Sequence, residues 1–181
     1  MVDIIKGADK SIIVRLNSRV TGDPFDLTGI DRIKACFIKK SGTSALSLFY
    51  LPRTANITNG SDIIASIDVT DIAEGMPVTG TGIPVGATVL KTPSSTTSPT
   101  AANTIKISSN ATATTTGVSL VIGDIAIVSA LLGKIRILLS EAQTDLLKAG
   151  TGLNFEVSTV LDGYTRTVQF LKSLNVIERI C

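Results

Sequence analysis

The sequence lacks histidine and tryptophan, and it has only two cysteines among its 181 residues. Histidine is the commonest general base and metal ligand, so its absence removes the most frequent route to either role. The cysteines, Cys36 and Cys181, show no CxxC spacing. We interpret Cys36, inside the apolar stretch 35–38, as a buried reduced thiol. Cys181 is interpreted as a free thiol, with an intermolecular disulfide as the alternative.

Aromatic residues and net charge are also scarce. Aromatic residues make up 4% of the chain, and the formal net charge is only +2. So small a net charge predicts no attraction to nucleic acid or to a membrane surface. The longest apolar run, residues 125–132, is far shorter than the roughly 20 residues that a bilayer requires. Because Met1-Val2-Asp3 lacks the regions of a signal peptide, we expect a protein made in a reducing cytoplasm.

No group of residues combines a nucleophile, a base and an orienting side chain in a plausible arrangement. We therefore predict no enzyme activity, no catalytic residue and no bound cofactor. Three acidic residues in one stretch, Asp68, Asp71 and Glu74, could supply oxygen ligands to Ca²⁺. Their spacing matches no known calcium-binding loop, so we interpret them as solvated turn residues and predict no metal site.

Two further patterns, a group of glycines and a group of cations, have both a functional and a structural interpretation. Gly80, Gly82 and Gly86 superficially resemble a phosphate-binding loop. No Gly-Lys-Ser/Thr follows them and no helix is expected after Gly86, so we interpret them as turns at a sheet corner. The cations around the second expected strand are too few for a nucleic-acid patch and have no interleaved aromatics. We assign them to a solvated strand face (Arg32, Lys34, Lys39 and Lys40).

The residues that are abundant favour β-structure. Apolar residues make up 44% of the chain, mean hydropathy is +0.39, and Ile, Val, Leu and Thr dominate, as is typical of strands. Strands bounded by turn residues are expected at 11–16, 33–40, 46–51, 63–67, 104–108 and 118–122, with Pro52 closing the third. A short turn of helix is expected at 71–78, a glycine-punctuated β segment at 79–89, and a loop at 91–103.

The most strongly patterned segment runs from Gly133 to Val176. Polar and apolar residues alternate in 134–137 and again in 153–158, which predicts two half-buried strands. Ser140 and Gln143 have the spacing of a capping box and predict a helix start. Gly150 is expected to end that helix after about two and a half turns. Asp162-Gly163 predicts a tight β-hairpin, whose two central residues both need positive φ.

A compositional change divides the chain. Between Thr54 and Asp124, small residues crowd the sequence, and two lysines stand against five acidic residues, a net charge of −3. The remainder carries +5, since the total is +2. We predict a discontinuous domain of residues 1–53 plus 125–181, interrupted by a Thr/Gly-rich β module of residues 54–124. The spacing of short strands and turns favours an all-β sandwich.

Two stretches resemble the N-terminal domain of phage baseplate upper proteins and related tail proteins. The first is 3–29, with the turn Gly22-Asp23-Pro24-Phe25-Asp26-Leu27-Thr28-Gly29, and the second is 133–150 with the hairpin that follows. The resemblance covers about 110 residues and implies an immunoglobulin-like β-sandwich with one short helix. Residues 71–89 resemble a small β module of tail and fibre proteins, here inserted into the sandwich.

The resemblance implies a non-enzymatic structural component of a bacteriophage virion, assembled in the bacterial host cytoplasm. Its role would be in the tail, baseplate or neck, through contacts with other virion proteins and as a homo-oligomer. The expected intersubunit segments are 1–6, 177–181 and 91–103. A head decoration or head-fibre protein is one alternative. A carbohydrate-binding host-adhesion module is another, although most aromatics stand in apolar strand contexts (Phe25, Phe37, Phe49, Tyr50, Phe155, Tyr164 and Phe170).

Overall fold

The chain was analysed as a computed structural model, which describes residues 3–5, 10–18, 21–39, 42, 44–96, 100–147 and 152–177. It divides into two compact units. Unit 1 consists of Met1–Phe49 and Asp124–Cys181, and unit 2 is Tyr50–Gly123. The sequence prediction places the two boundaries slightly later in the chain, at 53/54 and 124/125. The regular secondary structure of the described chain is β-strand, apart from one short α-helix.

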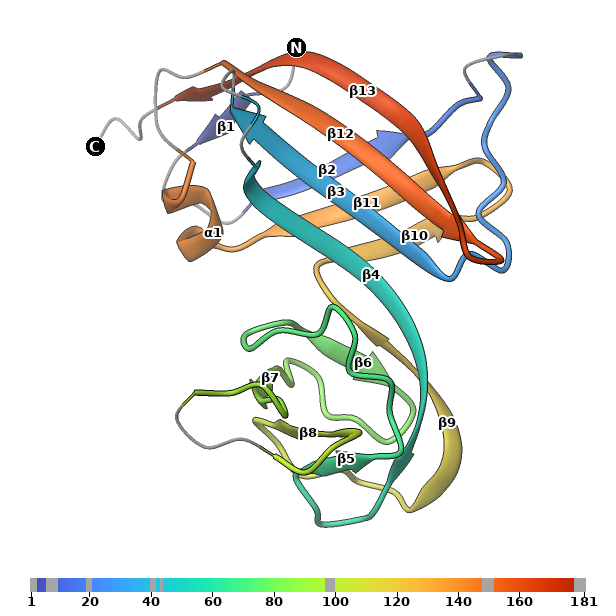
Figure 1. The fold of residues 1–181 in the computed structure, drawn as a ribbon, viewed down its shortest axis with the longest axis vertical. Coiled ribbons are helices and arrows are strands. Elements are labelled where there is room, and N and C mark those ends of the chain that lie inside the picture. Colours follow the sequence, from blue (N-terminus) through green and yellow to red (C-terminus); the bar gives the residue numbers. More distant parts are fainter. Residues whose placement is uncertain are drawn as a thin grey trace. The chain divides into compact units, whose positions relative to one another are not determined.

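Unit 1 is built from two layers of strands, which Figure 1 shows with their labels. The larger sheet has the order β1-β13-β12-β3-β4, and the smaller has the order β10-β11-β2. β1 pairs with β13 in parallel, whereas β12 is antiparallel to both of its neighbours. The bounds of the strands are β1 Asp3–Ile5, β2 Lys10–Arg15, β3 Arg32–Lys39, β4 Ser44–Ile57, β10 Ile125–Ser129, β11 Lys134–Leu139, β12 Gly152–Leu161 and β13 Tyr164–Ile177.

The core of unit 1 lies between these two sheets, because every second residue of the facing strands is buried. Along β3 the side chains of Ile33, Ala35 and Phe37 have no exposed surface. The rings of Phe37 and Phe155, on adjacent strands, lie 5.1 Å apart at 50°, a favourable tilted geometry. The smaller sheet adds its own alternate residues to this core (Ile12, Val14, Ile135, Ile137 and Leu139). Unit 1 is therefore a β-sandwich.

The hairpin prediction is confirmed, and the helix prediction is confirmed at its start only. Asp162 and Gly163 have φ of 50° and 77° and join β12 to β13. Helix α1, Glu141–Asp145, begins with the predicted capping box: Ser140 N donates to Gln143 Oε1 at 2.8 Å, and Gln143 N donates to Ser140 Oγ at 3.2 Å. The helix is shorter than predicted, with Leu146 as its C-cap, while Gly150 lies outside the described residues. After the helix, Leu147 N donates to the carbonyl oxygen three residues earlier, Thr144 O, at 3.1 Å, and Leu147 is fully buried.

Unit 2 is a small β module around the second half of β4. β4 pairs with β9 (Thr115–Ile122), which also pairs with β6 (Val78–Gly80). A second group joins β5 (Ile63–Ala65), β8 (Thr104–Ile107) and β7 (Val89–Lys91). Its core is aliphatic, with no exposed surface on Leu51, Ile64, Val78, Ile105 or Ile122.

Two expectations for unit 2 are wrong. Pro52 does not close a strand, since β4 continues through it to Ile57 and Pro52 lies opposite Val121. A sheet tolerates proline where its nitrogen faces no partner. Residues 71–76 form turns rather than a helical turn, since Gly75 has a φ of 84° and its N–H donates to Val89 O at 2.8 Å, and the segment then runs into β6 at Val78. That hydrogen bond joins the segment to β7, where a helical turn would have bonded Gly75 N to a carbonyl oxygen of a nearby residue.

Candidate functional site

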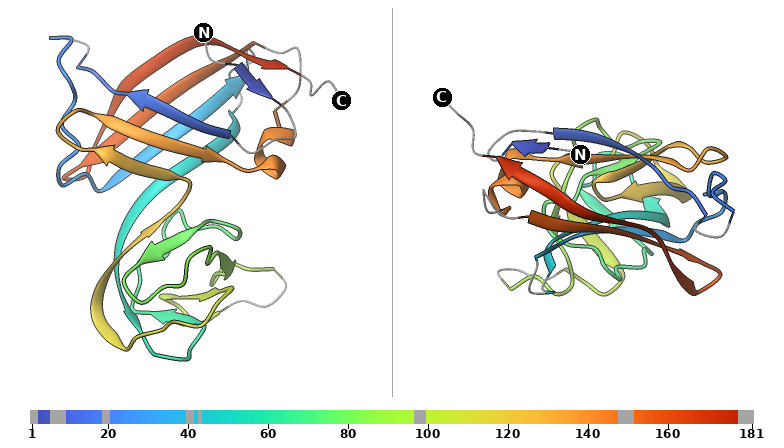
Figure 2. Two further views of the ribbon diagram at one scale, coloured as in Figure 1. Left: turned by 180° about the vertical axis from the view of Figure 1, so that it is seen from behind. Right: turned by 90° about the horizontal axis from the view of Figure 1, so that it is seen from above.

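The outward side of the smaller sheet of unit 1 is the surface with the most unusual composition. We call it the outer face and define it by six residues: Ile13 and Arg15 on β2, Lys134, Arg136 and Leu138 on β11, and Val128 on β10. Neighbouring residues in β2 and β11 are buried, so the alternation of a strand turns these side chains away from the core. In the left view of Figure 2 the three strands lie side by side in front of the larger sheet.

The strand register brings the members of the outer face together. Ile13 lies opposite Arg136, and Arg15 lies opposite Lys134. Leu138 lies opposite Ser11 and is therefore a diagonal neighbour of Ile13, within reach of a side-chain contact. Val128 stands at the register shift between β10 and β11. Arg136 therefore lies on the middle strand between Ile13 and Ala126, with Leu138 toward one end of the face and Lys134 and Arg15 toward the other, so that cations and apolar side chains alternate across it.

The apolar side chains of this face are unusually exposed. Ile13 is 66% exposed, Val128 50% and Leu138 45%. The β10–β11 turn continues the pattern, with Leu131 at 73% and Leu132 at 44%. Of ten exposed large hydrophobic side chains among the described residues, five therefore belong to this one sheet and its turn. Concentration of apolar surface in one place marks an interaction site rather than the ordinary scatter of a protein surface.

The charges of the outer face have one sign. Strands β2, β10 and β11 contain no acidic residue, and their cations are Lys10, Arg15, Lys134 and Arg136. The ion pairs Arg53–Asp68 and Lys106–Asp62 both lie in unit 2, away from the outer-face residues. Acidic residues stand next to these strands in the sequence, at Asp9 before β2, at Asp124 before β10 and at Glu141 after β11. The cations are thus available to a carboxylate from outside the sheet.

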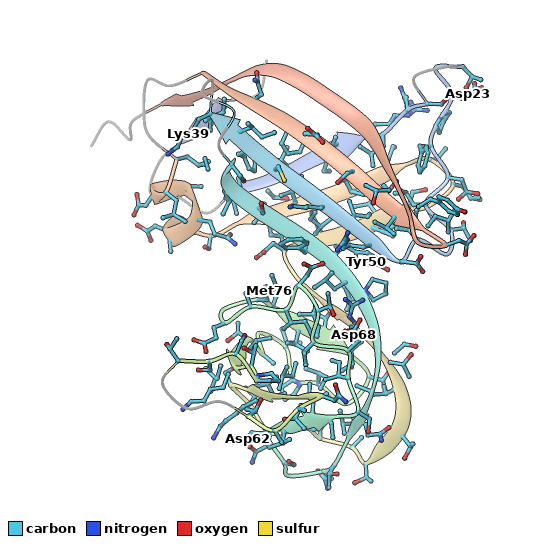
Figure 3. The ribbon with its side chains drawn as sticks, in the orientation of Figure 1. Asp23, Lys39, Tyr50, Asp62, Asp68 and Met76 are labelled. Atoms are coloured by element: carbon cyan, nitrogen blue, oxygen red, sulfur yellow. The ribbon has the colours of Figure 1, made fainter. Side chains whose placement is uncertain are left out.

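Asp68, Asp71 and Glu74, the predicted solvated acids, lie in turns of unit 2. Asp68, labelled in Figure 3, lies beside β4, where Arg53 binds its segment. Arg53 Nε donates to Asp68 O and Nη2 donates to Thr70 O, both at 3.0 Å, and Nη2 lies 3.6 Å from Asp68 Oδ2. The bond from Thr70 N to Asp68 Oδ1 (2.9 Å) lowers the pKa of Asp68, and Arg53 adds to the effect. Asp68 therefore already has hydrogen-bond and ion-pair partners within unit 2.

The glycines that resemble a phosphate loop serve packing and turns. Gly80, at the end of β6, has no room for a side chain: a Cβ there would lie 2.6 Å from Leu120 Cδ2. A Cβ on Gly82 would lie 2.7 Å from Ile57 Cδ1. Gly86 stands in open space with a φ of 82°. The next element after Gly86 is the strand β7 and not a helix, which agrees with the turn interpretation.

The cations of β3 face away from the core, as expected. Lys34 is half-buried, with Nζ 5.7 Å from the centre of the Phe49 ring, within range of a cation–π contact. Lys39 is exposed, and Lys40 lies outside the described residues. Cys36 is free but only half-buried, not buried as predicted. It shares the outward side of β3 with Lys34, and its Sγ lies 3.5 Å from Ser47 Oγ.

The aromatic residues form no exposed platform in the described part of the chain. Phe37 and Phe155 are buried, and Phe25, Phe49 and Tyr50 are half-buried. Burial raises the pKa of Tyr50. Tyr164, at the hairpin, is 74% exposed, and the side chain of Phe170 lies outside the described residues. A shallow hollow of about 690 Å³ in unit 2 is lined by small and polar residues without an aromatic (Ala65, Ser66, Ile67, Asp68, Ala102, Asn103 and Thr104).

The predicted intersubunit segments are only partly described. Asp3–Ile5 pairs in parallel with Asn175–Ile177, so these end segments bind one another within the chain. Residues 1–2, 6 and 178–181, including Cys181, lie outside the described residues. In the loop 91–103, Thr92 is 4% exposed and its carbonyl accepts from Ser95 N and Thr100 N. Their role between subunits stays a prediction.

The outer face was missed by sequence reasoning, although the sequence holds a signal for it. Ile12-Ile13-Val14 and Ile137-Leu138-Leu139 place apolar residues on both sides of a strand. A half-buried strand needs apolar residues on one side only. The excess apolar residue in each run, Ile13 or Leu138, is the one that the fold leaves exposed.

No family model, no curated protein and no solved structure matches this chain. Within its described part, no three acidic, histidine or cysteine side chains lie close enough together to hold a metal ion. None of the described helices is long and apolar enough to cross a membrane.

Proposed function

We propose that the protein is a non-enzymatic structural component of a bacteriophage virion, acting in tail, baseplate or neck assembly through protein–protein contacts. The observation that carries this proposal is the outer face, an exposed apolar and cationic surface on a regular sheet. Such a surface is suited to binding another protein. It is too flat and too poor in convergent polar groups to bind a small substrate.

The strand order of unit 1 supports the resemblance on which the virion role depends. In an immunoglobulin-type sandwich, strands B, E and D form one sheet and C, F and G the other, and variable-type domains add C′ beside C. With unit 2 set aside, β2, β11 and β10 match B, E and D, while β3, β12, β13 and β4 match C, F, G and C′. The inserted module then lies between C′ and D.

The chemistry of the described residues also favours binding over catalysis. The chain has no histidine, and two acids of unit 2, Asp68 and Asp62, form ion pairs with Arg53 and Lys106. The aromatic side chains do not form the exposed stacking surface that a carbohydrate-binding module would use. Assembly by surface complementarity requires none of these groups.

The test is to delete the gene from the phage that encodes the protein and to image the particles by negative stain. We expect incomplete particles that regain their structure when purified protein is added. Labelled protein would then be found at one place in the particle, which distinguishes tail, baseplate and neck from head. Complete, infectious particles without the protein would contradict the structural role.

A further inference from the structure

We infer that the outer face docks an apolar and acidic surface of a different protein, rather than a second copy of this chain. Its location in the particle rests on the proposed function. The inference itself rests on the composition and charge of Ile13, Arg15, Val128, Lys134, Arg136 and Leu138.

The exposed apolar side chains of the outer face require a cover. Ile13 and Leu138 are diagonal neighbours at 66% and 45% exposure, and Val128 on the third strand is 50% exposed. Burying such side chains is favourable at about 25 cal/mol for each Å² of apolar surface removed from water. A regular sheet face holds them in place before binding, so little conformational entropy is lost on contact.

The cations of the outer face determine which kind of partner can cover this surface. Arg136 lies between Ile13 and Ala126, and Arg15 lies opposite Lys134 beside them; none of the three cations has an ion-pair partner among the described residues. A cation that loses its water in an interface is costly unless a carboxylate meets it. The guanidinium groups of Arg15 and Arg136 can each bind a carboxylate through two parallel hydrogen bonds. An occupant without acidic groups would leave three desolvated cations.

A second copy does not meet this requirement when it binds by the same face. A two-fold contact is self-complementary, so each residue near the axis meets its own counterpart or a neighbour from the same patch. Three cations from each copy would then share one interface without a carboxylate from the three strands. Like charges facing each other in an interface cost several kcal/mol. The outer face of a second copy therefore cannot cover it, and the occupant presents acidic residues around an apolar patch.

Zero-length carbodiimide cross-linking of intact particles tests this directly, because it joins a lysine only to a carboxylate that touches it. We expect Lys134 to be joined to an aspartate or glutamate of another virion protein. Lys134 joined to an acidic residue of a second copy would overturn the inference. So would a Lys134 that stays fully reactive toward acetylation in the particle.

Reconstitution onto particles purified without the protein gives a quantitative readout. Arg136→Glu should lower incorporation at least tenfold, whereas Arg136→Lys retains most of it, and raising the salt concentration should weaken wild-type binding. The matched control is Lys39→Glu, an exposed cation on the other sheet of unit 1, which should incorporate like wild type. Circular dichroism melting checks that all variants are folded.

The outcomes separate the two proposals. Wild-type protein that is absent from particles, and is not taken up by particles lacking it, contradicts the virion role and the inference together. Wild-type protein that incorporates while Arg136→Glu incorporates equally well overturns the inference and leaves the virion role standing.

Discussion

Leu16 and Gly133, 117 positions apart in the sequence (133 minus 16), meet backbone to backbone in unit 1. Leu16 N donates to Gly133 O at 2.8 Å, and Phe25 N donates to Leu16 O at 2.9 Å. Gly133 has a φ of 59°, and a Cβ on it would collide with the carbonyl oxygen of Leu16 and lie 2.8 Å from that of Phe25. The turn that presents Leu131 and Leu132 therefore depends on a glycine at this position.

Gly133→Ala should destabilise unit 1 by about 3 kcal/mol, because backbone overpacking adds to the cost of positive φ. The matched control is Gly163→Ala, which has a φ of 77° but open space around it. The control should cost only about 1 kcal/mol, for positive φ alone. Urea unfolding followed by circular dichroism measures both, and equal midpoints for the two variants would contradict the packing argument.

Because of its buried carboxyl group, Asp124 should make unit 1 less stable as pH rises. Burial raises its pKa above 3.8, and a hydrogen bond with the Gln143 side chain offsets part of that effect. The folded state therefore binds the proton of Asp124 more tightly than the unfolded state does. Its contribution to the free energy of unfolding falls as pH rises from about 3.8 through the raised pKa. Asp124→Asn keeps a side-chain amide that can hydrogen-bond to the Gln143 side chain, and it removes the ionisable carboxyl group.

The measurement for Asp124 is the difference in urea midpoint between Asp124→Asn and wild type at pH 4 and pH 7. We expect the difference to favour the variant more strongly at pH 7, where wild type buries a charge. Glu141→Gln, an exposed carboxylate near the same helix start, serves as control. A difference that is larger at pH 4 would show the opposite sign of shift.

Arg53 should matter to unit 2 mainly through its bonds to carbonyl oxygens. It donates to Pro52 O, Asp68 O and Thr70 O, whereas its ion pair with the 61% exposed Asp68 side chain is long at 3.6 Å. Arg53→Ala should cost about 2 kcal/mol through the lost charged hydrogen bonds. Asp68→Asn, which keeps an acceptor for Thr70 N and removes only the ion pair, should cost less than about 1 kcal/mol. Thermal melting of both variants checks the order; a more destabilising Asp68→Asn would mean that the ion pair dominates.

The capping box of α1 predicts a modest loss on mutation. Ser140→Ala removes the acceptor for Gln143 N and should cost about 1 kcal/mol. Ser44→Ala, an exposed serine hydroxyl bonded only to Ser47 Oγ at 3.2 Å, should change stability by less than about 0.5 kcal/mol. Urea midpoints give both values, and a Ser140→Ala variant as stable as wild type would show that the cap contributes nothing.

Unit 1 should fold without unit 2. Leu51 and Ile122 are direct partners in the β4–β9 ladder, so the chain leaves and re-enters the sandwich at neighbouring points. A short Gly-Ser linker in place of residues 50–123 can therefore join Phe49 to Asp124. We expect a cooperative melt and a β-type circular dichroism spectrum. An unfolded deletion variant would show that unit 2 contributes to the core of unit 1.

The sequence by itself determined the features that depend on near neighbours. The Asp162-Gly163 hairpin, the Ser140–Gln143 capping box and the alternating core residues of β11 and β12 were all predictable, because a turn, a cap or a strand period involves only a few consecutive residues. The division into a sandwich and an inserted module was suggested by composition alone.

Only the tertiary structure decided the features that join distant segments. Pro52 lies within β4, opposite Val121, and Gly75 is joined to β7; partners remote in sequence overrode local turn and helix signals in both cases. The outer face has the same origin: Ile13 and Arg136 become neighbours only through the β2–β11 register. Local patterning can show that Ile13 is an extra apolar residue in its strand, but pairing between remote strands decides which side chains surround it.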